Sequence, residues 1–254
     1  HDLMWGDFDH LIRSDKPEEN KDFKVLRSMS EFDDSKINIL LAVEGGHNFY
    51  DTGQEMIDLD EALRRLKYFK SPNTERLLYV TFTHLTRQEF CNHAYGMKLI
   101  NDQRFAPNGD GISEPGKKFI RTALDNQFGQ RILIDIKHMS LKARKQFYTM
   151  HTAEFPDAPI MATHMGMTGV SWNKKLVRKV KEAKKYDGYK VWYHQTPGAL
   201  NTRFNPWSIN LYDEDIIAIV NSGGLIGLSL DQRILGCGGS SAEYISKKEF
   251  VTSE

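Results

Sequence analysis

The chain contains the stretch Ile132-Leu133-Ile134-Asp135-Ile136-Lys137-His138-Met139-Ser140, in which a short apolar run leads into a histidine. Four other stretches follow the same plan: Ile37–Val43 before Glu44, Leu77–Thr83 before His84, Pro159–Thr163 before His164, and Leu225–Leu230 before Asp231. Short, almost wholly apolar runs are typical of strands that are buried on both faces of a parallel sheet. The sequence therefore predicts five strands of this kind.

Amphipathic segments alternate with these runs and are predicted to be helices: Asp58–Phe69, Glu114–Gln127, Ser140–His151, Asn173–Tyr186 and Asp213–Asn221. The second of them has Ser113 as a candidate N-cap and Pro115 at the first helical position. Strands that alternate with helices of this length indicate βαβ units and a parallel sheet. The polar segment before residue 36 offers no convincing strand. Five strands are fewer than the eight of a closed barrel, so an open doubly wound sheet remains an alternative.

The bulk composition excludes several classes of partner. The chain has 254 residues, enough for one large α/β barrel or two smaller domains. Lys and Arg number 34, as do Asp and Glu, so no net charge attracts nucleic acid or an anionic membrane. The basic run from Lys174 to Lys185 is interpreted as the solvated face of a helix. No apolar run reaches the ~18 residues that a membrane span needs.

The compartment and the oligomeric state stay open in the sequence. Cys91 and Cys237 are too few and too far apart to form a disulfide scaffold or a local zinc knuckle. Cytoplasmic residence and export after removal of a signal are both compatible with this composition, and so is a homodimer.

Residues that can bind a metal follow the predicted strands. Glu44, His84, His138 and His164 each come at or just beyond a strand end, and Asp231 is a weaker fifth candidate. In a barrel the carboxyl ends of the strands converge on one face, where active sites are built. A lone histidine after a strand is more often structural, but four such positions favour a metal site. A carboxylate together with neutral imidazoles is a ligand set of hydrolytic zinc.

A family resemblance adds to this reading. Leu40-Leu41-Ala42-Val43-Glu44-Gly45-Gly46-His47 resembles the Glu-Gly-Gly-His motif of the renal (membrane) dipeptidase family, within the metal-dependent amidohydrolase superfamily. Four further stretches resemble segments of that family in the same order: Tyr79–His84, Gly111–Gly116, Ile132–Ser140 and Pro159–His164. The resemblance covers residues 38–230.

The resemblance implies a (β/α)8 TIM-type barrel in which the five visible strands are the third to the seventh. It implies one domain over residues 1–254, truncated at both ends. It also implies metal-dependent cleavage of a dipeptide or a similar small amide. Glu44 would bridge two divalent ions, expected to be Zn²⁺, that are also held by His138 and His164. His84 would contact the substrate and stabilise the oxyanion, and Arg203 would hold a substrate carboxylate.

The chain also departs from the family pattern. The His-x-Asp pair of the family's first strand and the Asp of its last strand are absent. The residues after His84 and His164 differ from those of the family, and extra residues precede Arg203. Two alternatives therefore remain beside the dipeptidase interpretation. One is another amidohydrolase chemistry, such as lactone, ester or N-acyl amino acid hydrolysis, and the other is a non-catalytic degenerate barrel.

Overall fold

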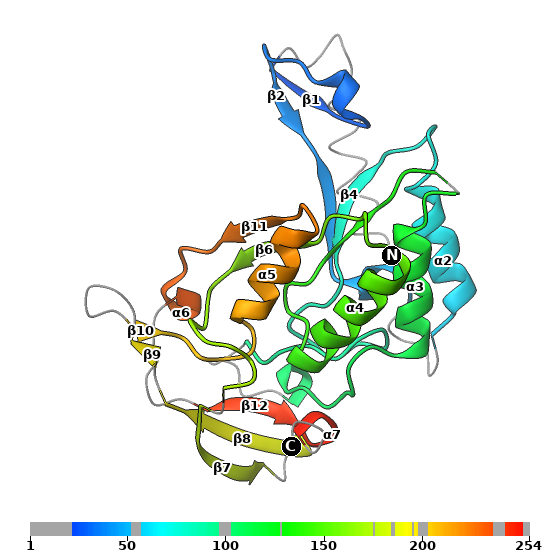
Figure 1. Ribbon diagram of the computed structural model, residues 1–254. Helices are drawn as coiled ribbons and strands as arrows, with labels where there is room; N and C mark the ends of the chain where they lie inside the picture. The colour runs from blue at the N-terminus through cyan, green and yellow to red at the C-terminus, as the bar shows by residue number, and fades with distance from the viewer. Residues whose placement is uncertain are drawn as a thin grey trace.

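A parallel sheet of five strands lies at the centre of a mixed α/β fold (Figure 1). The structure, a computed structural model, describes residues 22–51, 57–96, 103–127, 129–174, 176–183, 186–194, 196–197, 203–235 and 242–250. The five strands are β3 (Leu41–Glu44), β4 (Leu77–Thr81), β5 (Leu133–Asp135), β6 (Met161–Met165) and β11 (Leu225–Leu228). Each overlaps one of the predicted apolar runs, so the five predicted strands and their parallel sheet are confirmed.

The order of the strands in this sheet is β11-β6-β5-β4-β3, and each neighbouring pair is parallel. The order of these five strands in the sheet is thus the same as their order along the chain. A doubly wound sheet reverses its strand order at a switch point, and the described sheet has no such reversal. The described strands do not close on themselves, so β3 and β11 are the edges of the sheet.

The first predicted run is divided between two sheets. Residues Ile37–Ile39 form β2, which pairs in parallel with β1 (Phe23–Val25), whereas β3 pairs with β4. The expectation that no strand precedes residue 36 is therefore wrong for β1. Its three residues become a strand because β2 supplies the backbone partners that a short isolated segment lacks. The side chain of Leu40, between β2 and β3, is half exposed at the change of partner.

Four predicted helices are confirmed as α2 (Leu59–Tyr68), α3 (Glu114–Leu124), α4 (Leu141–Glu154) and α5 (Asp213–Asn221). The first three begin at capping side chains, since Asp58, Ser113 and Ser140 each accept a hydrogen bond from a backbone N–H of the first turn. Each of the four helices connects two successive strands of the sheet. α2 packs against α3, and α5 packs against β11.

The predicted helix Asn173–Tyr186 is wrong. Half of this segment is β7 (Val177–Ala183), which pairs antiparallel with β8 (Gly188–Tyr193). The basic residues of β7 are exposed to solvent, as expected, but they lie on a strand and not on a helix. The aromatic and β-branched residues of β8 favour a ladder, and Asp187 and Gly188 lie where the chain returns, with Asp187 at φ 48°. Pairing with β8 thus overrides the local helical pattern.

The remaining elements are short. β12 (Glu243–Ser246) completes a three-stranded antiparallel sheet with β7 and β8. The others are β9 (Thr196–Pro197), β10 (Arg203–Phe204), α6 (Gln232–Leu235), α7 (Lys247–Phe250) and the 3₁₀ turns η1 (Met29–Glu31), η2 (Gly46–Phe49) and η3 (Gln103–Phe105). None of the described helices combines the length and the apolar character that crossing a membrane requires.

One hydrophobic core joins the five-stranded sheet to its helices. Leu66 of α2, Phe119 of α3 and Phe147 of α4 are buried in the same cluster as Val80 and Ile134 of the sheet. Burying a large apolar side chain contributes about 1.5–3 kcal/mol. The core therefore fixes the strands whose carboxyl ends carry the candidate ligands.

Candidate metal centre

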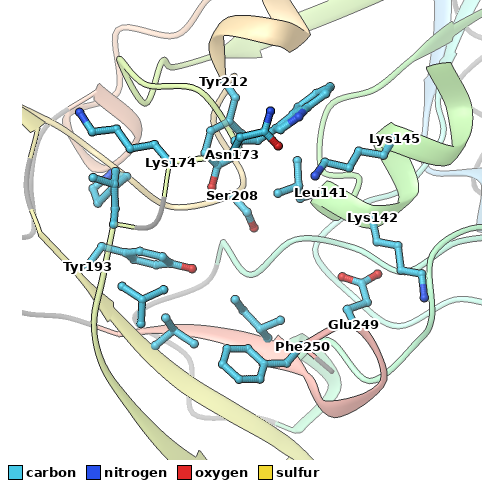
Figure 2. A pocket seen from close by; sticks show the side chains of 16 residues that line it. Leu141, Lys142, Lys145, Asn173, Lys174, Tyr193, Ser208, Tyr212, Glu249 and Phe250 are labelled. Carbon is cyan, nitrogen blue, oxygen red and sulfur yellow. The ribbon is translucent and has the colours of Figure 1, made fainter. Parts of the chain in front are cut away.

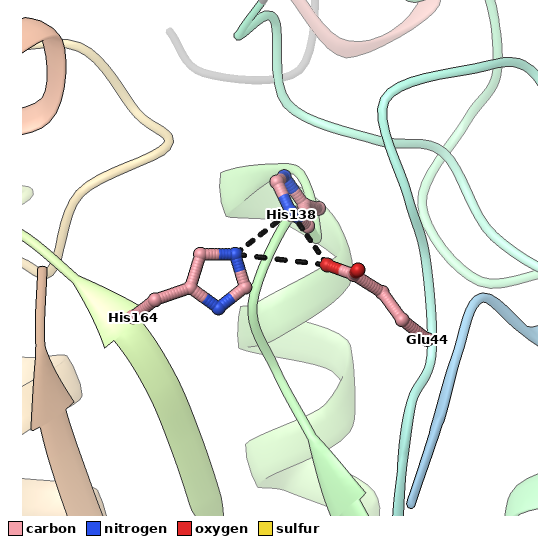
Figure 3. Close-up of side chains that lie close together, drawn as sticks. All are labelled: Glu44, His138 and His164. Carbon is pink, nitrogen blue, oxygen red and sulfur yellow. Dashed lines mark hydrogen bonds and ion pairs between the residues drawn. The ribbon is translucent and has the colours of Figure 1, made fainter. Parts of the chain in front are cut away.

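Glu44, His138 and His164 come together at the carboxyl end of the five-stranded sheet (Figure 3). Nε2 of His138 lies 3.5 Å from Oε1 of Glu44, and Nε2 of His164 lies 3.6 Å from the same oxygen. The two imidazole Nε2 atoms are 3.3 Å apart. The three predicted ligands thus converge through one atom each.

The local backbone explains why these side chains converge. Glu44 ends β3 and is followed by Gly45, which has φ 103°, a conformation that favours glycine. A Cβ on Gly45 would lie 2.3 Å from Cε1 of His47, so the His47 ring would have to shift. His138 follows the end of β5 in a turn and also has positive φ, 67°. A non-glycine residue in this conformation costs about 1–3 kcal/mol.

His84 lies beside this group. Its Nε2 atom is 3.5 Å from Oε1 of Glu44, and its ring lies edge-on to that of His138 with centroids 5.1 Å apart. His84 is about one-third exposed, whereas His138 is 5% exposed. His84 therefore lies against Glu44 and His138, with part of its ring open to solvent.

The protonation states of the three residues suit a cation. The contact with His138, followed by the charges of the neighbouring histidines, lowers the pKa of Glu44 to about 2, against the opposing effect of burial. Burial lowers the pKa of His138 to about 3 and also lowers that of His164. At neutral pH the group therefore offers a charged carboxylate and two neutral imidazoles, which are the forms that bind metals.

The spacing of the three atoms also fits a metal ion. Ligand atoms about 2.0–2.1 Å from a tetrahedral zinc lie about 3.4 Å from one another. The measured separations of 3.3, 3.5 and 3.6 Å match one face of such a tetrahedron. One carboxylate and two imidazoles suit zinc and the neighbouring divalent transition metals. The residues present therefore fit the ion that the sequence predicts.

Arg203 and Asp231 are not members of the three-residue group. Arg203 belongs to β10, where it is exposed and pairs in register with Pro197 of β9. Asp231 follows β11, and its backbone N–H donates to Oγ of Ser229 at 3.1 Å. The role of Arg203 as a carboxylate clamp stays a prediction.

Two charged residues near the site are missed by the strand-end pattern. The side chains of Asp135 and Lys137 are both fully buried on either side of Ile136, directly before His138. Among the described residues, Nζ of Lys137 has no hydrogen-bond partner. Charged residues inside an apolar strand are rare unless they are paired. Asp135 and Lys137 interrupt the apolar run before His138, and this interruption is the signal that could have identified them in the sequence.

A separate cavity of about 470 Å³ lies between α4, β8 and α7 (Figure 2). Lysines and aromatic rings line it, among them Lys145, Trp172, Tyr193 and Phe250. None of the predicted site residues lines this cavity. It is therefore distinct from the group around Glu44.

Comparisons with known proteins give a distant structural likeness. No protein-family model matches the chain, and no curated protein matches its sequence. Among solved structures, the chain is similar to the crystal structure of the probable dipeptidase PvdM from Pseudomonas aeruginosa, with 18% identity and a TM-score of 0.49. The likeness covers 82% of this chain but only 38% of that protein. The function therefore has to be inferred from the geometry of the site.

Proposed function

We propose that this chain is a metal-dependent hydrolase of the dipeptidase-like amidohydrolase type. The observation that supports the proposal is the approach of Glu44 Oε1 and the Nε2 atoms of His138 and His164 to within 3.3–3.6 Å of one another. A carboxylate oxygen and two imidazole nitrogens at this spacing are suited to share one cation. Glu44, His138 and His164 would hold the ion, and the second oxygen of Glu44 would let it bridge a pair of Zn²⁺ ions.

When bound, a divalent ion supplies an activated water and polarises a carbonyl group. The chain's own residues then have separate roles. His84 would donate a hydrogen bond from its exposed position to the oxygen that gains negative charge, a contribution of roughly 3 kcal/mol. Arg203 would bind the free carboxylate of a dipeptide-like substrate, because a planar guanidinium can donate two parallel hydrogen bonds.

We also propose that the five-stranded sheet is part of a (β/α)8 barrel within a single domain. Sequential parallel strands joined by helices are the arrangement of such a barrel. Both edges of the sheet carry exposed apolar side chains, since Leu225 and Leu228 of β11 are 62% and 59% exposed and Leu40 beside β3 is 48% exposed. Apolar side chains at an open edge favour pairing with further strands.

Elemental analysis of the purified protein, combined with a substrate panel, tests the proposal. We expect at least one equivalent of zinc or a related divalent metal, and hydrolysis of L,L- or L,D-dipeptides that a chelator abolishes and added metal restores. The panel includes N-acyl amino acids, lactones and carboxylic esters, so that another amidohydrolase chemistry is detected. A protein that binds no metal, or one that holds metal and cleaves only lactones or esters, would contradict the dipeptidase proposal.

A further inference from the structure

Asp135 lies immediately behind the proposed metal ligands. It is the last residue of β5, and its side chain is fully buried. In the sheet it pairs in register with Thr81 of β4, which pairs in turn with Glu44 of β3. A buried carboxylate needs hydrogen-bond donors to compensate for its lost hydration, so its partners identify what it does.

Asp135 accepts four hydrogen bonds. Oδ2 accepts from the hydroxyl groups of Thr81 at 2.6 Å and Thr163 at 2.7 Å. Oδ1 accepts from the backbone N–H groups of Lys137 and Thr163, both at 3.0 Å. An ionised carboxylate is only an acceptor and has about four lone-pair sites. All of its capacity is therefore used, and each of the four partners must act as a donor.

This requirement fixes the proton of the Thr163 hydroxyl. Because that proton points to Asp135, the hydroxyl oxygen can only accept a hydrogen bond from another group. Nδ1 of His164 lies 2.9 Å from it. A neutral imidazole carries one N–H, so the contact requires the proton of His164 on Nδ1. Its Nε2 atom, which faces Glu44, is then left with a free lone pair.

We propose that Asp135 and Thr163 are positioning residues that select the Nδ1–H tautomer of His164 and thereby prepare Nε2 to bind the metal. The inference rests on the proposed function, because it gives His164 the role of a ligand. Partners of the second ring nitrogen commonly fix the tautomer and orientation of ligating histidines. Here a threonine hydroxyl stands between the carboxylate and the imidazole.

Thr81 provides a matched control. Thr81 and Thr163 donate to the same oxygen of Asp135 at nearly the same distance, and they flank β5 on the neighbouring strands β4 and β6. Of these two hydroxyl groups, only that of Thr163 contacts Nδ1 of His164. Thr163→Val and Thr81→Val therefore each remove one hydrogen bond to Asp135, but only the first removes the acceptor for His164.

The experiment has two readouts on the folded full chain. Two-bond ¹H–¹⁵N NMR spectra of the metal-free protein report which ring nitrogen of each histidine carries the proton, and His164→Asn identifies the signals of His164. Titration with Zn²⁺ against a chromophoric chelator reports the metal affinity. We expect His164 to carry its proton on Nδ1 in the wild type, in T81V and in T163S, and to lose this preference in T163V. The metal affinity should fall about 10–100-fold in T163V and stay close to the wild-type value in T81V.

The two readouts separate this inference from the proposed function. A wild-type His164 with its proton on Nε2, or equal losses of metal affinity in T163V and T81V, would overturn the role of Asp135 and Thr163. If the wild type binds no metal, the hydrolase proposal fails, and the NMR spectra still decide whether Asp135 and Thr163 select the tautomer.

Discussion

Oε1 of Glu44 lies 3.5 Å from Nε2 of His138, and the two residues come from the ends of β3 and β5, which are separated in the sheet by β4. Glu44 is 47% exposed and His138 only 5% exposed. The carboxylate thus reaches from an edge strand of the sheet toward a buried imidazole.

Glu44→Gln should weaken metal binding. An amide oxygen is neutral and a poorer ligand than a carboxylate, so we expect a loss of more than about 100-fold, beyond the 10–100-fold caused by disturbing supporting residues. Glu61→Gln is the control, because Glu61 also has a pKa of about 2 but owes it to Arg64 and Arg65. Chelator competition with Zn²⁺ measures both variants. Equal affinities of E44Q and the wild type would remove Glu44 from the ligand set.

His84→Ala should reduce turnover without releasing the metal. We place His84 as a donor to the charge that develops on the substrate, and removing one such donor costs about 10²–10³-fold in kcat. The metal content should stay at the wild-type level, since the other three residues form the ligand group. His194→Ala, at an exposed position, serves as the control. A metal-free H84A protein, or one with wild-type kcat, would be inconsistent with this role.

Arg203→Ala should raise KM for dipeptides by about 10–100-fold with a smaller effect on kcat. The expected size corresponds to the ~1.5–3 kcal/mol of hydrogen bonds to a charged group. Dipeptides whose terminal carboxylate is amidated should be cleaved equally by R203A and the wild type. If R203A loses as much activity on the amidated substrates, Arg203 does not act on that carboxylate.

Asp215→Asn should destabilise the fold strongly. Nε of Arg144 donates to Asp215 at 3.0 Å, and neither side chain is exposed. Removing one partner of a buried pair leaves an uncompensated charge and costs about 3–5 kcal/mol. Glu154→Gln breaks the exposed Arg121–Glu154 pair at 2.7 Å and should cost at most about 1 kcal/mol. Urea unfolding measures both free energies, and similar values for the two variants would refute the prediction.

Glu243 should make the fold less stable as the pH rises. Burial raises the pKa of its carboxyl from 4.5 to about 7, although Ser208 and Tyr193 donate hydrogen bonds to it. Between pH 4.5 and about 7 the unfolded chain releases this proton while the folded chain keeps it. The resulting loss of stability grows across this window and then levels off, at up to about 3 kcal/mol.

Glu243→Gln removes this titration. Its free energy of unfolding relative to the wild type should therefore be more favourable at about pH 8 than at about pH 5. Urea unfolding at the two pH values gives the comparison. A difference between variant and wild type that does not change with pH would show that Glu243 titrates alike in the folded and unfolded chains.

The sequence by itself determines the elements that a local pattern encodes. Apolar runs such as Ile132–Ile136 and capped amphipathic segments such as Asp58–Phe69 become the expected strands and helices, because burial selects their periodicity residue by residue. Residues 44, 138 and 164 can be expected to meet for a related reason, since parallel strands bring their carboxyl ends to one edge of a sheet. Their roles as metal ligands stay predictions.

Tertiary structure decides what depends on distant partners. Val177–Ala183 is a strand because β8 pairs with it, although its own sequence predicts a helix. Phe23–Val25 is a strand only beside β2. The hydrogen bonds that join Asp135 to His164 through Thr163 cannot be read along the chain, because they cross from β5 to β6. Strand pairing and buried polar contacts depend on which surfaces meet, and that is fixed only when the whole core has packed.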